Sequence, residues 1–106
     1  MEEKPNLLYI KKLAGEDLAF EAKFIAIIKE EFPLEVNEYM RCVIDQQFKE
    51  TAEIVHKLKH KLNILGLEQA YKLAVQYEED LHNSETKLDK KFRIILKNIE
   101  NFIKTI

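Results

Sequence analysis

Apolar side chains recur at intervals of three and four residues along most of this chain, which is the spacing of one face of an α-helix. The pattern runs unbroken through the last part of the chain, at Leu88, Phe92, Ile95, Leu96, Ile99, Phe102, Ile103 and Ile106. Glycine and proline number only two each among the 106 residues. Because so few turn-forming residues leave little room for a β-sandwich or barrel, the sequence predicts an all-α protein of long helices.

Breaks in this pattern divide the chain into one short helix and four longer ones. The expected ranges are 6–13, 16–44, 48–65, 67–82 and 85–106. Asn6 suits the amino-terminal cap of the short helix, and Asn83 and Ser84 are cap-type residues that would open the last one. Four long helices with short links predict a single domain, residues 1–106, folded as an antiparallel up-and-down four-helix bundle. Residues 1–15 would form an amino-terminal extension of this bundle.

Two residues should shape these helices. Pro33 lies inside the first long helix, where it removes one backbone donor and clashes with the carbonyl of Lys29. We therefore expect a kink near Pro33, or two helices that meet end to end. Gly66 is expected to adopt a left-handed conformation at the end of the next helix, which lets Leu67 fold back onto Leu62.

The composition favours a soluble cytoplasmic protein. Apolar residues make up 46% and charged residues 34% of the chain, an ordinary globular balance, and the net charge of −2 argues against a general nucleic-acid binder. The single cysteine, Cys42, suits a reducing compartment and is expected to pack as a small apolar group. The first residues lack the order of a signal peptide, and no apolar run approaches the roughly 20 residues of a membrane span.

His56 is expected to face water. At roughly 100° of rotation per residue, the apolar side chains of the 48–65 helix fall on one arc, and His56 lies about 140° from the centre of that arc. The arc comprises Phe48, Thr51, Ile54, Val55, Leu58, Leu62 and Leu65. On the other side of the helix, Lys59, His60 and Asn63 follow His56 at helical spacing. Lys59, one turn along the helix, can reach whatever the imidazole carries.

An exposed imidazole beside a lysine favours phosphoryl chemistry. Imidazole is a good nucleophile near pH 7, and phosphoryl transfer needs little more than an in-line nucleophile and positive charge around the equatorial oxygens. No serine or cysteine lies nearby in sequence to form a catalytic triad. The surrounding face is basic, and Lys57 and Lys61 repel each other at four-residue spacing. An acidic docking partner would offset this repulsion, so Lys57, His60, Lys61 and Asn63 are candidate partner-binding residues.

Glu78 is an unexpected residue in the 67–82 helix, because it lies only about 40° from the centre of that helix's apolar stripe. A half-buried carboxylate needs a partner. If the two helices pack side by side, Glu78 can accept a hydrogen bond from one ring nitrogen of His56, which would fix the tautomer and leave the other nitrogen as the nucleophile. Pairing of Glu78 with a lysine, or contact with solvent, is the simpler alternative.

The stretch from Ala52 to Leu67 (AEIVHKLKHKLNILGL) resembles the signature of histidine phosphotransfer (HPt) domains. In that signature the phospho-accepting histidine is followed by a leucine, a lysine and a glycine that closes the helix, here His56, Leu58, Lys59 and Gly66. The resemblance extends to the preceding proline-containing helix, to an aromatic residue at Phe48 and to the two following helices. One departure is His60, which stands where the family usually has a small residue that leaves room for a partner.

The resemblance implies an intermediate in a multistep two-component phosphorelay. His56 would accept a phosphoryl group from an aspartate of a receiver domain, within a hybrid sensor histidine kinase, and pass it to the receiver of a response regulator. Lys59 would steady the phosphoryl oxygens, and Glu78 falls where the family commonly has a residue that contacts the histidine. Magnesium would sit in the receiver, so this chain needs no cofactor or metal and has no kinase activity of its own. We expect a monomer that binds neither nucleic acid nor membrane.

Three other interpretations stay open. His56 and His60, four residues apart on one helix face, can chelate zinc, although two ligands make a weak site. The chain can also be a helical adaptor that binds partners through its surface alone, without chemistry at His56. Nucleic-acid binding through the basic strip has less support, because no aromatic side chain lies on that face to stack bases.

Overall fold

The computed structural model describes residues 3–106, and within this range every regular element is a helix. The helices are α1 (Leu8–Ala14), α2 (Leu18–Ile44), α3 (Phe48–Ile64), α4 (Glu68–His82) and α5 (Asp89–Ile103). The predicted all-α class is therefore confirmed. Met1 and Glu2 of the predicted amino-terminal extension lie outside the described residues. None of the helices within residues 3–106 combines the length and apolar character needed to cross a bilayer.

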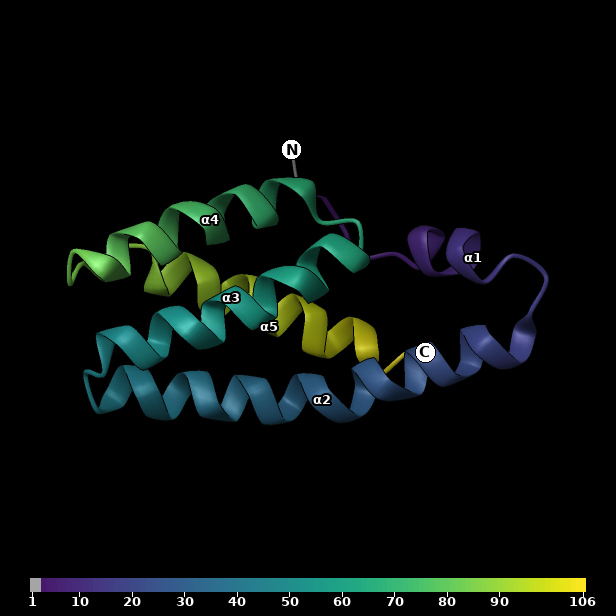
Figure 1. Ribbon diagram of the computed structural model, residues 1–106, viewed down its shortest axis with the longest axis horizontal. Coiled ribbons are helices and arrows are strands. Elements are labelled where there is room, and N and C mark those ends of the chain that lie inside the picture. Colours follow the sequence, from purple (N-terminus) through teal and green to yellow (C-terminus); the bar gives the residue numbers. More distant parts are fainter. Residues whose placement is uncertain (1–2) are drawn as a thin grey trace.

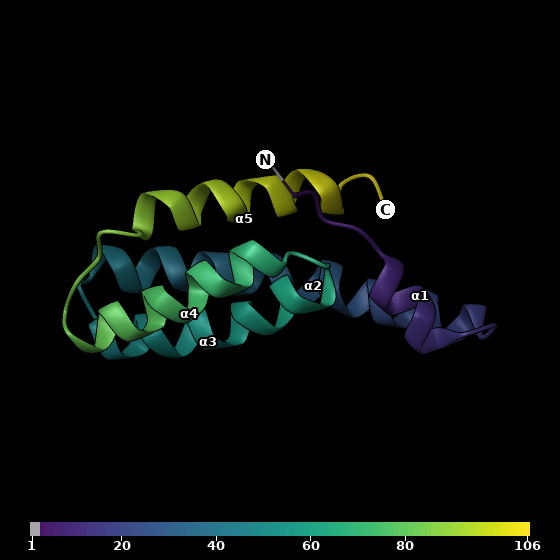
Figure 2. The same ribbon diagram turned by 90° about the horizontal axis from the view of Figure 1, so that it is seen from above.

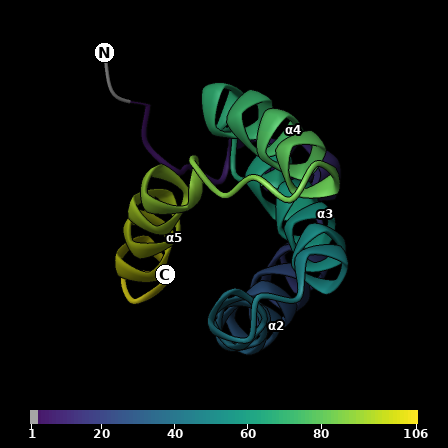
Figure 3. The same cartoon turned by 90° about the vertical axis from the view of Figure 1, so that its left-hand side faces the viewer.

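The four longer helices lie side by side along the long axis of the molecule, and the chain turns back at each of the three connections between them (Figure 1). Viewed from one end, they surround a common interior (Figure 3). α3 contacts α2 and α4, while α5 contacts α4 and α2. One hydrophobic cluster draws buried side chains from all five helices, including Ile10 of α1. α1 packs against α2 at one end of the molecule (Figure 2).

α2 continues as one helix through Pro33, so the expectation of two helices that meet end to end is wrong. Proline removes only one donor from the ladder, and buried contacts of the neighbouring Phe32 and Val36 hold the helix on either side. The kink near Pro33 stays a prediction. At its start, Asp17 caps α2 by accepting a hydrogen bond from the backbone N–H of Phe20 at 2.9 Å. Cys42 has a free thiol and is buried, in agreement with its predicted packing as a small apolar group.

Asn83 and Ser84 end α4 and do not open α5, which corrects the sequence-based prediction. The backbone N–H groups of Asn83 and Glu85 both donate to the carbonyl of Asp80 at 2.9 Å, and Ser84 adopts a left-handed φ of 59°. These bonds satisfy carbonyls at the end of α4. Residues 83–88 therefore form a connection, and α5 begins only at Asp89.

The connection between α3 and α4 matches the prediction for Gly66, whose φ is 76°. The backbone N–H of Leu67 donates to the carbonyl of Leu62 at 2.9 Å, as in a Schellman motif. Residues of the amino-terminal segment cover this turn. The side chain of Asn6 lies against Gly66, and the carboxylate of Glu3 accepts hydrogen bonds from two backbone N–H groups in the first turn of α4. The turn is thus held by its own backbone hydrogen bond and by side chains of the amino-terminal segment.

Candidate functional site

The apolar stripe of α3 is buried as predicted, and His56 consequently points outward. Ile54, Val55, Leu58 and Leu62 are almost completely inaccessible to solvent, whereas the side chain of His56 is 52% exposed. The helical period determines this direction, because a residue on the far side of the helix from a buried stripe has to face water. The site therefore starts from an accessible imidazole on a rigid helix.

Glu78 of α4 contacts this imidazole. Its Oε2 lies 3.1 Å and its Oε1 lies 3.4 Å from Nδ1 of His56. Because a carboxylate only accepts hydrogen bonds, Nδ1 is the nitrogen that carries the proton. The close packing of α3 on α4 brings the two side chains together, and Glu78 is only 23% exposed. In the neutral ring, this contact makes Nε2 the nitrogen with the free lone pair.

Lys59 shares the same carboxylate. Its Nζ lies 3.1 Å from Oε1 of Glu78, and its side chain is 13% exposed. The ammonium also lies 5.8 Å from the centroid of the Tyr71 ring, within reach of a cation–π contact. The contacts with Glu78 and Tyr71 therefore keep the Lys59 side chain against the protein and close to the carboxylate that binds His56. A lysine ammonium has three donors, so the bond to Glu78 leaves donors for a further anionic group.

The other predicted partner-binding residues divide into two groups. Lys57, His60 and Asn63 are exposed on α3, and the ring of His60 lies edge-on to that of His56 with 5.0 Å between centroids. Lys61, by contrast, is buried, with a side chain that is 10% exposed. These four residues therefore do not form one solvent-facing strip.

The burial of Lys61 corrects the expectation of a continuous basic strip. Its Nζ lies 3.0 Å from Glu31 and 3.1 Å from Glu35, both on α2. The position of residue 61 at the edge of the α3 stripe turns its side chain toward the neighbouring helix. The repulsion between Lys57 and Lys61 is consequently offset inside the molecule by two carboxylates, and no docking partner is required for this purpose.

A buried polar network within the core escaped the sequence-based prediction. The hydroxyl of Tyr39 on α2 donates to Asp89 of α5, and the hydroxyls of Tyr39 and Tyr77 lie 2.7 Å apart. Arg93 closes the network with an ion pair to Asp89 at 3.0 Å. Burial raises the pKa of Tyr77 to about 12, and burial followed by the hydrogen bond to Asp89 raises the pKa of Tyr39 further. The available signal was the presence of two tyrosines on apolar stripes, since buried hydroxyls need partners.

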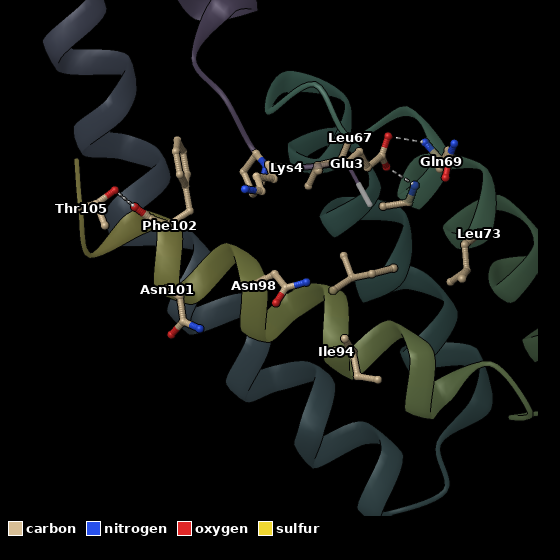
Figure 4. Close-up of a pocket in the computed structure, with 13 residues that line it drawn as sticks. Glu3, Lys4, Leu67, Gln69, Leu73, Ile94, Asn98, Asn101, Phe102 and Thr105 are labelled. Atoms are coloured by element: carbon tan, nitrogen blue, oxygen red, sulfur yellow. Dashed lines mark hydrogen bonds between the residues drawn. The ribbon is translucent and has the colours of Figure 1, made fainter. Parts of the chain in front are cut away.

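A cavity of about 790 Å³ lies between α4, α5 and the amino-terminal segment (Figure 4). Apolar side chains such as Leu73, Ile95 and Phe102 line it, and polar groups such as Asn98 and Lys4 stand at its rim. Neither His56 nor Glu78 belongs to its walls. Within residues 3–106, no group of three or more His, Cys, Asp and Glu side chains is arranged to hold a metal ion.

Comparisons of the chain with protein-family models, with curated proteins and with solved structures found no match. The site is therefore interpreted from its own geometry. That geometry consists of an accessible imidazole with one nitrogen committed to a carboxylate and an ammonium within the same cluster. Such an arrangement is suited to a nucleophile that accepts an anionic group.

Proposed function

We propose that this protein is a histidine-containing phosphotransfer intermediate of a multistep phosphorelay, with His56 as the phosphoryl acceptor. The observation that carries the proposal is the contact of Glu78 with Nδ1 of an exposed His56, at 3.1 Å, beside the ammonium of Lys59. The HPt-like stretch around His56 supports the same function. The proposal includes the finer arrangement expected from the sequence, an antiparallel up-and-down four-helix bundle, in a protein of the cytoplasm.

The proposed reaction begins with a receiver domain that carries an aspartyl phosphate. Nε2 of His56 attacks the phosphorus in line, a P–N bond forms, and the bond from phosphorus to the aspartyl oxygen breaks to release the carboxylate. The positive charge that develops on the ring is stabilised by Glu78, which keeps its hydrogen bond to Nδ1. One of the remaining donors of Lys59 binds a phosphoryl oxygen. The reverse reaction passes the group to the aspartate of a second receiver.

The partners in this proposal are receiver domains, one of them belonging to a hybrid sensor histidine kinase. The magnesium ion required for the chemistry would be held by the receiver. Lys57, His60 and Asn63, which are exposed around His56, are the residues proposed to contact it. Lys61 is left out of this surface because its ammonium binds Glu31 and Glu35.

The direct test is transfer of radiolabelled phosphate from a phosphorylated receiver domain to the full-length protein. We expect the protein to acquire a label that is stable in base and labile in acid, as is characteristic of a phosphohistidine and not of an aspartyl phosphate. His56→Gln should abolish the label. His82→Gln supplies the matched control, because His82 is an exposed histidine at the far end of α4.

The outcomes separate the proposal from its alternatives. Loss of label in His56→Gln with retention in His82→Gln supports phosphotransfer at His56. Label that persists in His56→Gln, or no label from any of a panel of receivers, contradicts it. Receiver binding that is unchanged by His56→Ala, without phosphoryl exchange, indicates an adaptor.

A further inference from the structure

We propose that His56 and His60 form a two-imidazole site for a borderline divalent cation such as Zn²⁺ or Cu²⁺. We further infer that the bound ion competes with the phosphoryl group for His56, and this second step rests on the proposed function. Imidazole nitrogens are common ligands of these ions, and four-residue spacing brings two histidines to one helix face. The site is distinct from the receiver-bound magnesium, which prefers oxygen ligands.

The two rings lie close enough together to share one ion once a nitrogen of each is turned toward it. Two imidazoles bound to zinc through Zn–N bonds of about 2.1 Å, in tetrahedral geometry, have ring centroids about 5 Å apart. The centroids of His56 and His60 lie 5.0 Å apart, with the ring planes at 89°. Both side chains are exposed, so rotation of the His60 ring can direct one of its nitrogens toward Nε2 of His56.

Glu78 already provides the outer contact that metal-binding histidines use. A histidine that binds a metal ordinarily donates its second ring N–H to a carboxylate or carbonyl, which fixes the tautomer and raises the basicity of the other nitrogen. Glu78 holds Nδ1 of His56 at 3.1 Å, so the lone pair of Nε2 is available to an ion. Lys59 forms an ion pair with the same carboxylate, and this ion pair offsets its charge.

The site has only two protein ligands among the described residues, because no third side chain completes a metal-binding group. The remaining coordination positions of the ion are open to water. Binding through Nε2 of His56 would occupy the lone pair that attacks phosphorus in the proposed reaction. A bound ion is therefore expected to slow phosphoryl acceptance until it dissociates.

Calorimetric titration of the full-length, metal-free protein with ZnCl₂ tests the site without any phosphoryl donor. We expect one ion per chain, and an affinity at least tenfold lower in His60→Ala and in His56→Gln. His82→Ala is the matched control and should leave the affinity within about twofold, since it removes a histidine that lies outside the pair. With Cu²⁺, electron paramagnetic resonance should detect two coordinated nitrogens in the wild-type protein and one in His60→Ala.

Equal zinc affinity in the wild type, His60→Ala and His82→Ala, or no binding to the wild type, overturns the proposed metal site. Phosphoryl labelling gives an independent result. If zinc binds through the pair while His56→Gln retains the label, phosphotransfer fails and the metal site stands. If labelling depends on His56 while zinc does not bind, the metal site fails and phosphotransfer stands. Zinc that slows labelling of the wild type and of His60→Ala equally contradicts the inferred competition.

Discussion

One carboxylate, Glu78, satisfies both an imidazole and an ammonium, with distances of 3.1 Å to Nδ1 of His56 and 3.1 Å to Nζ of Lys59. This sharing has a physical consequence for the proposed site. The carboxylate aligns the ring and holds the lysine close, but it also partly neutralises the charge that would attract a phosphoryl group. Glu78 is thus a positioning residue, acting through His56 and Lys59.

Replacing Glu78 tests this role. Glu78→Ala should slow phosphoryl acceptance by about tenfold to a hundredfold, because a hydrogen bond to a charged group contributes about 1.5–3 kcal/mol. Glu78→Gln should keep an acceptor for Nδ1 and stay within about threefold of the wild-type rate. Rates are measured by label transfer from a phosphorylated receiver. Nitrogen NMR of the His56 ring gives a readout independent of activity and should show loss of the single tautomer in Glu78→Ala. Unchanged rate and tautomer in that variant would exclude the positioning role, and Glu79→Ala serves as the control.

Lys61 is the second residue whose environment leads to a measurable effect. Lys61→Met should lower the free energy of unfolding by about 1–3 kcal/mol, because it leaves the largely buried carboxylate of Glu35 without its cation. Lys57→Met, at an exposed position on the same helix, should change it by no more than about 0.5 kcal/mol. Urea denaturation measures both variants. Equal stability of the two would show that the Lys61 ion pairs contribute nothing.

At the scale of elements, the connection between α3 and α4 is held by backbone geometry and by the amino-terminal segment together. Gly66 has a left-handed φ of 76°, and a Cβ placed there would lie 2.7 Å from the side-chain nitrogen of Asn6. The carboxylate of Glu3 adds hydrogen bonds of 3.1 Å and 2.7 Å to the N–H groups of Gln69 and Ala70. This connection sets how α4 lies against α3, and hence where Glu78 meets His56.

Gly66→Ala should therefore destabilise the protein by about 1–2 kcal/mol, from backbone strain and from the contact with Asn6. A double-mutant cycle with Asn6→Ala separates these two causes, because the Asn6 side chain is absent from the second background. Thermal and urea unfolding of the four proteins provide the measurements. A cost of Gly66→Ala that is the same in both backgrounds would assign the whole effect to backbone strain.

At the scale of the whole molecule, the network of Tyr39, Tyr77 and Asp89 joins α2, α4 and α5 through the core. These polar bonds add to the apolar contacts through which α5 packs on the core. Burial raises the pKa of Tyr77 to about 12 from an ordinary value near 10. The folded state therefore retains the phenolic proton at a pH where the unfolded chain has lost it.

The sign of the resulting pH dependence follows from proton linkage. The contribution of Tyr77 to the free energy of unfolding should be fully present below about pH 10. It should fall as the pH rises toward 12, since over this interval the folded state binds more protons than the unfolded state. Tyr77→Phe should reduce the loss between pH 9 and 12 by about 2 kcal/mol. Chemical denaturation at a series of pH values measures it, with Tyr9→Phe, at an exposed tyrosine, as the control. Identical pH dependence in the wild type and Tyr77→Phe would rule out this contribution.

Local features of this protein were predictable because they depend on residues close together in the chain. The 3.6-residue period determines which side chains of α3 share a face, so the outward direction of His56 could be deduced before any packing was known. The left-handed conformation of Gly66 follows from the conformational freedom of a single glycine. Asn83 and Ser84 were assigned to the wrong helix because both are residue types that favour the start of a helix, whereas here they follow the end of α4.

Contacts between helices were decided only by the tertiary structure. The sequence offered His56 and a lysine as alternative partners of Glu78, and the packing of α4 on α3 brings His56 and Lys59 to it together. Similarly, the sequence indicated that Lys61 is an exposed cation, whereas in the fold Glu31 and Glu35 of α2 lie beside it. The hydrogen bond from Tyr39 to Asp89 also joins residues far apart in the chain. Helical periodicity specifies the direction of a side chain from its own axis, whereas the identity of its neighbour depends on how separate helices share one core.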